Sequence, residues 1–90
     1  MFKFEVHSIL NGKSEDKYNP KFETYADAIN YISRVVKAIK DEVTANLFDP
    51  YLTEFKNSNK LIPDADMNAL TFEYTVDGKS FINRWEIKEI

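Results

Sequence analysis

The sequence of 90 residues contains no cysteine, a single histidine and only two glycines. The lack of cysteine excludes disulfides, thiolate metal sites and cysteine nucleophiles. One histidine cannot form a multi-histidine metal site, and Gly12 and Gly78 stand too far apart to form a glycine-rich phosphate loop. These shortages leave few residues from which an active site is assembled. We therefore expect a protein that is not an enzyme and that needs neither a cofactor nor a metal.

Long apolar runs and a strong charge are missing as well. No stretch reaches the roughly eighteen consecutive apolar residues of a membrane-spanning helix, and the opening "FKFEVHSIL" alternates like a strand instead of resembling a signal peptide. The net charge is −3, whereas sequence-independent nucleic-acid binding requires a basic surface. We expect a cytoplasmic protein that contacts neither membrane nor nucleic acid directly.

Aromatic residues, by contrast, are plentiful: seven Phe, five Tyr and one Trp. Burial of each such side chain contributes roughly 1.5–3 kcal/mol, which is enough to build one core without disulfides. The length indicates a single domain over residues 1–90. Ten lysines against two arginines, together with many Asn, Ile, Phe and Tyr, indicate AT-rich coding, as in a low-GC bacterium or a phage or mobile element living in one.

The N-terminal segment predicts a strand over residues 2–10, because its side chains alternate between an apolar and a largely polar face. Asn11-Gly12 follows, the dipeptide most typical of a two-residue hairpin turn. The next stretch, residues 13–21, is nearly all polar. The sequence therefore leaves open whether it forms a second strand at the edge of the sheet. The apolar face of the first strand comprises Phe2, Phe4, Val6 and Leu10.

The middle of the chain predicts a long amphipathic helix that begins after Thr24 and ends before Asp49-Pro50. Thr24 and Asp27 have the spacing of a capping box, and the following apolar residues recur every three or four positions. Asp49 and Pro50 are typical of the N-cap and first position of a second, short helix over residues 50–57. Residues 57–69 read as a loop.

The C-terminal segment predicts a hairpin around Asp77-Gly78, with a type I′ turn. In that register Leu70 lies opposite Trp85, and both belong to the apolar face that the helix covers. Arg84 points to the other face. The fold class is therefore α+β: a three- to four-stranded, mainly antiparallel sheet with one long amphipathic helix on one face. Its order is β-(β)-α-(short α)-β-β.

Three patterns resemble functional motifs. His7 shares a strand face with Glu5, so the two can form an acid–base pair, although a solvated histidine is the simpler interpretation. The loop sequence "DADMNA", residues 64–69, begins like a calcium-binding loop but lacks the glycine and the glutamate that such a loop requires. The sheet aromatics resemble a base-stacking platform, but the helix needs that face for its own apolar stripe.

What remains is surface, and it predicts a non-enzymatic protein-binding or regulatory module that acts through its exposed sheet face or edge. Its partner is another protein or a second copy in a homodimer. One alternative is a phage- or mobile-element-encoded inhibitor that binds a host nucleic-acid enzyme, and a second is a minor enzyme that uses His7 and Glu5. The predicted binding residues are Glu5, His7, Ile9, Tyr31, Tyr51, Glu73, Ile82, Arg84 and Glu86.

Overall fold

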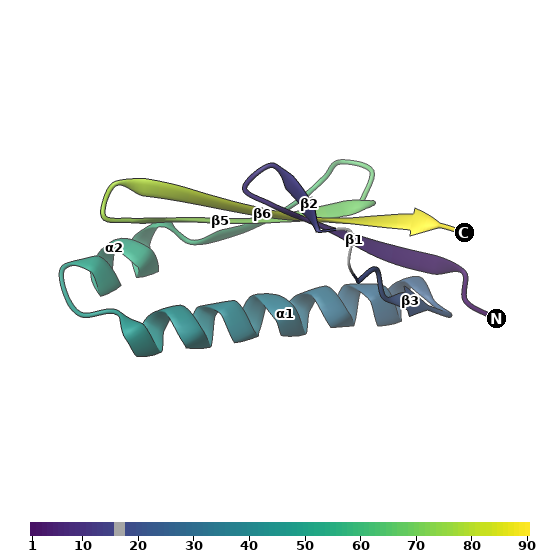
Figure 1. Ribbon diagram of the computed structural model, residues 1–90, viewed down its shortest axis with the longest axis horizontal. Helices are drawn as coiled ribbons and strands as arrows, with labels where there is room; N and C mark the ends of the chain where they lie inside the picture. Colours follow the sequence, from purple (N-terminus) through teal and green to yellow (C-terminus); the bar gives the residue numbers. More distant parts are fainter. Residues whose placement is uncertain (16–17) are drawn as a thin grey trace.

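The computed structural model describes residues 1–15 and 18–90 and has an α+β architecture. A long helix crosses beneath an antiparallel sheet, and a short helix lies near one end of it (Figure 1). In chain order the elements are β1 (Phe4–Leu10), β2 (Lys13–Glu15), β3 (Lys21–Phe22), α1 (Tyr25–Asn46), α2 (Tyr51–Ser58), β4 (Lys60–Pro63), β5 (Ala69–Val76) and β6 (Lys79–Glu89).

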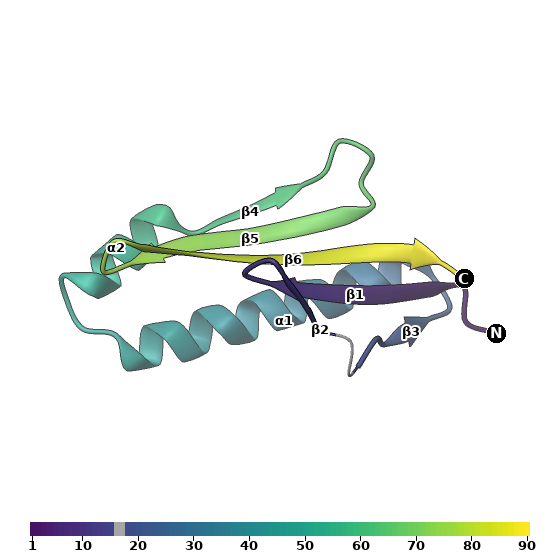
Figure 2. The same ribbon diagram turned by 45° about the horizontal axis from the view of Figure 1, so that its top comes forward.

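The sheet has six strands in the order β2-β1-β6-β5-β4, with β3 also paired to β1, and every pairing is antiparallel. The prediction of three to four strands was therefore too low. The first and last strands, β1 and β6, lie side by side in the middle of the sheet (Figure 2). Helix α1 covers one face, and neither helix of the described chain is long and apolar enough to cross a membrane.

Both edges of the sheet are built from short strands, and these strands account for the difference between the six strands observed and the three to four predicted. The second strand left open by the sequence forms as β2, after a turn in which Asn11 and Gly12 both have positive φ, 49° and 82°. This is the backbone of a type I′ turn. One further residue of the 13–21 stretch, Lys21, belongs to β3 and pairs with Glu5 of β1, next to Phe22, which pairs with Phe4. Residues 16 and 17 of that stretch lie outside the described residues.

Strand β4 contradicts the prediction of a loop over residues 57–69. Its four residues pair with β5, with Ile62 opposite Thr71. Leu61 and Ile62 give too short an apolar pattern to indicate a strand alone, and Pro63 argues against one because it lacks an N–H. The pairing forms because β5 offers its backbone along a whole side, and Asp64 N–H extends it by donating to the Ala69 carbonyl at 3.0 Å.

Helix α1 begins where its cap predicts. Thr24 has an extended backbone, and its hydroxyl accepts a hydrogen bond from the Asp27 N–H at 3.1 Å. The helix α2 begins at Tyr51, one residue later than predicted, because Pro50 is the cap position. Asp49 still acts as an acceptor at this end: its Oδ1 receives the Thr53 N–H at 3.2 Å and the Thr53 hydroxyl at 2.7 Å.

The register predicted for the C-terminal hairpin is confirmed, with Leu70 opposite Trp85 and Tyr74 opposite Phe81. Asp77 and Gly78 have φ values of 55° and 70°, as a type I′ turn requires. Trp85 is 2% exposed and Ile82 is 46% exposed, so the two faces of β6 are assigned correctly. The core joins both helices to the three central strands through Val6, Ala28, Ile32, Val36, Phe55, Leu70, Phe72, Trp85 and Ile87.

Candidate binding face of the sheet

The face of the sheet opposite α1, here called the open face, brings together seven of the nine predicted binding residues. Strand alternation places them there, because their neighbours Val6, Phe72 and Trp85 point into the core. Cross-strand pairing then sets them side by side: Ile9 lies opposite Arg84, His7 opposite Glu86, and Glu73 opposite Ile82. The seven are Glu5, His7, Ile9, Glu73, Ile82, Arg84 and Glu86.

The two predicted tyrosines lie elsewhere. Tyr31 belongs to α1, where its ring centroid is 5.3 Å from that of Phe22. Burial, and then the neighbouring Tyr18, raise the pKa of the Tyr31 hydroxyl. Tyr51 is the first residue of α2 and is 42% exposed. Neither residue belongs to the open face. The sequence did not indicate this, because helical periodicity alone does not say which side of the molecule a helix presents.

Arg84 is held at the centre of the open face by a bidentate ion pair with Asp64. Its Nη1 lies 2.9 Å from Asp64 Oδ1 and its Nη2 lies 2.7 Å from Asp64 Oδ2. Nη1 is also 3.4 Å from the Thr71 hydroxyl, and Nε is 3.4 Å from Glu86 Oε2. The hydrogen bonds from Arg84 lower the pKa of the Asp64 carboxyl, and Asp64 raises the pKa of Arg84. The guanidinium therefore has one fixed orientation.

Asp64 is the residue of this site that the sequence did not indicate. It lies in the loop between β4 and β5, whose sequence begins like a calcium-binding loop but lacks the glycine and the glutamate of one. Asp66 in this loop stabilises a turn, because its Oδ1 accepts the Asn68 N–H at 3.1 Å. No group of three or more metal-ligating side chains occurs among residues 1–15 and 18–90.

Glu5 and His7 are in contact, whereas the sequence favoured a solvated histidine and left this pair as the alternative. His7 Nε2 lies 2.7 Å from Glu5 Oε1, and the Lys21 ammonium is 4.0 Å from the other carboxylate oxygen. Both side chains are largely covered: 27% of the His7 side chain and 18% of the Glu5 side chain are exposed. Neither residue lines the groove between α1 and the β5–β6 hairpin. The pair orders the surface of β1.

Apolar side chains flank the Asp64–Arg84 pair on the open face. One row of paired residues crosses four strands, from β1 through β6 and β5 to β4: Ile9, Arg84, Thr71 and Ile62. Ile82 lies two positions from Arg84 on β6, in the next row of the same face. Ile62 is 43% exposed and Ile82 is 46% exposed. A fixed guanidinium between exposed isoleucines offers directional hydrogen bonds beside apolar contact area, a combination suited to recognition of a protein surface.

Comparisons with known proteins do not point to a function. No protein-family model matches it, and no curated protein and no solved structure matches it either. The residues of the open face and their contacts are therefore the observations from which a function follows.

Proposed function

We propose that this protein is a small, non-enzymatic binding or regulatory module that engages a protein partner through its open face. The observation that carries the proposal is the placement of Arg84 on the same sheet face as the exposed side chains of Ile62 and Ile82. Arginine is favoured as an interface anchor. Its bidentate pairing with Asp64 also means that little side-chain freedom remains to be lost when a partner binds.

The proposed setting is the cytoplasm, where a chain without cysteine needs no oxidising environment. The partner is a protein whose contacting surface is apolar with an acidic or carbonyl acceptor, because Arg84 keeps one N–H on Nη2 beyond its four contacts and the isoleucines require apolar contacts. A second copy of the chain is the special case in which the partner is the protein itself.

The test is affinity capture from the producing cells with the tagged chain and two matched variants, followed by quantitative mass spectrometry. Ile82→Asp places a charge in the open face, whereas Phe48→Asp makes the same kind of change at a residue that is 83% exposed and lies between the helices. We expect a protein that is retained by the wild type and by Phe48→Asp and lost with Ile82→Asp. The proposal is contradicted if both variants lose every protein that the wild type retains, or if both variants keep all of them. Light scattering of the purified chain identifies the homodimer.

A further inference from the structure

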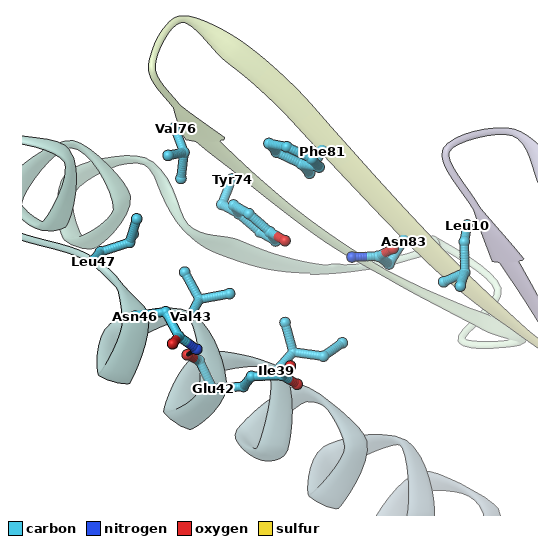
Figure 3. A pocket seen from close by; sticks show the side chains of 10 residues that line it. All are labelled: Leu10, Ile39, Glu42, Val43, Asn46, Leu47, Tyr74, Val76, Phe81 and Asn83. Atoms are coloured by element: carbon cyan, nitrogen blue, oxygen red, sulfur yellow. Dashed lines mark hydrogen bonds between the residues drawn. The ribbon is translucent and has the colours of Figure 1, made fainter.

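An apolar groove opens between the C-terminal half of α1 and the β5–β6 hairpin (Figure 3). It has a volume of about 480 Å³. It exists because β1 ends at Leu10, opposite Asn83, whereas β6 extends to Lys79 and α1 to Asn46. Beyond Leu10 no described strand covers that side of β6. The lining residues are Leu10, Ile39, Glu42, Val43, Asn46, Leu47, Tyr74, Val76, Phe81 and Asn83.

Two polar groups are directed into this groove from the sheet side. Asn83 is the only buried polar residue among the described ones and is 8% exposed. Figure 3 shows its amide and the Tyr74 hydroxyl directed toward each other in the opening. Neither side chain has a hydrogen-bond partner within the described part of the protein, in contrast to Asn11, Asn46 and Asn59. The Asn83 amide atoms are open to the groove, because Asn19 Oδ1 is the only buried side-chain polar atom without a partner among the described residues. The amide and the Tyr74 hydroxyl are therefore free to hydrogen-bond a ligand in the groove.

One carboxylate lines the groove, whereas the nearby Lys40 ammonium lies outside the lining, 5.7 Å from the centroid of the Phe72 ring. Glu42 is the only carboxylate or cationic side chain among the ten lining residues. Burial, and then the charge of Glu42, raise the pKa of the Tyr74 hydroxyl. The rings of Tyr74 and Phe81 stack with centroids 5.1 Å apart and planes at 16°. Aromatic faces and a carboxylate both attract cations, and the carboxylate repels anions.

We propose that this groove binds a small organic cation with an aromatic or aliphatic body. The ammonium lies near Glu42, the apolar body fills the space between Val43, Leu47 and Val76, and Asn83 supplies an additional hydrogen bond. The volume falls within the range of small-molecule sites, roughly 300–1,000 Å³. A standard protein interface needs about 20–30 residues on each side, more than the groove offers. The site lies on the helix side of the sheet and is independent of the open face.

Three indole probes of similar size and different charge test the proposal: tryptamine, tryptophol and indole-3-propionate. Binding is measured by titration with amide and side-chain NMR spectra of the labelled protein. We expect tryptamine to bind with a Kd on the order of 1 mM, as for a fragment of its size. It should bind about tenfold more tightly than indole-3-propionate, with tryptophol between them. The shifts should be confined to residues of the groove.

Matched variants assign the charge effect. Glu42→Gln should weaken tryptamine binding about fivefold and leave tryptophol unchanged, whereas Asp41→Asn, a neighbouring carboxylate on the solvent side of α1, should alter neither. Val43→Phe should fill the groove and weaken all three probes, with the folded spectrum retained. Equal affinity of the three probes, shifts outside the groove, or no effect of Glu42→Gln overturns the proposal.

Discussion

Arg84 and Trp85 are neighbours in sequence with different environments, because successive side chains of a strand point to opposite faces. Trp85 packs among core residues at 2% exposure. The Arg84 side chain is one-third exposed, and its two terminal nitrogens both donate hydrogen bonds to the Asp64 carboxylate. The charge on Asp64 is therefore the feature that keeps the centre of the open face in order.

The Asp64–Arg84 pair predicts an acid-sensitive contribution to stability. The ordinary pKa of an aspartate, 3.8, is lowered in the folded state by hydrogen bonds from Arg84. The folded chain therefore binds fewer protons than the unfolded chain. The contribution is complete above the ordinary pKa and is lost as the pH falls through the lowered folded-state pKa. Urea unfolding of the wild type and Asp64→Asn should show free energies of unfolding that differ at neutral pH and converge on acidification.

The control for this experiment is Asp41→Asn, which removes an exposed carboxylate that pairs only with Lys37. Its free energy of unfolding should follow that of the wild type across the same pH range. A constant difference between wild type and Asp64→Asn from neutral to strongly acidic pH contradicts the assigned role of Asp64.

Glu54 connects α2 to the tip of the β5–β6 hairpin. Its carboxylate accepts the N–H of Asp77 and, at 3.3 Å, the N–H of Gly78. We expect Glu54→Ala to lower the free energy of unfolding by about 1 kcal/mol, because two turn donors lose their acceptor. Amide exchange of Asp77 and Gly78 should accelerate relative to the rest of β5 and β6. Glu23→Ala, which removes an exposed carboxylate, should leave those two amides unchanged.

At the scale of elements, helix α1 depends on the cap that starts it. The Thr24 hydroxyl is the acceptor for the Asp27 N–H. Thr24→Ala should lower the free energy of unfolding by about 1 kcal/mol, whereas Thr24→Ser should retain most of the cap. Urea unfolding followed by circular dichroism measures both. Equal stability of the two variants would mean that the packing of Ala28 and Ile32 alone sets the start of the helix.

Local patterns of residues predicted the elements that contain their own signals. The stripe and cap of α1, the Asp77-Gly78 turn and the register that buries Trp85 all follow from residues a few positions apart. Strand β4 did not, because "KLIP" becomes a strand only through β5. The partner of Arg84 also escaped prediction, since Asp64 lies 20 positions away in a loop. The groove depends on where β1 ends relative to α1, which no single segment specifies.

At the scale of the whole molecule, one core links all the long elements. It draws residues from β1, α1, α2, β5 and β6, so no element keeps its apolar face covered without the others. We expect a single cooperative unfolding transition over residues 1–90. Trp85 fluorescence reports the sheet and far-UV circular dichroism reports mainly α1, and their urea midpoints should coincide. Separate midpoints would show that α1 and the sheet unfold independently.

The central position of β6 has a consequence for biosynthesis. β6 joins β1 on one side to β5 on the other, and it is synthesised after both of them. Until residues 79–89 emerge from the exit tunnel, β1 has no central partner and the apolar stripe of α1 has no complete surface to cover. We therefore expect the tertiary structure to form only after translation of this segment, and a product that stops before Lys79 to leave the apolar stripe of α1 incompletely covered.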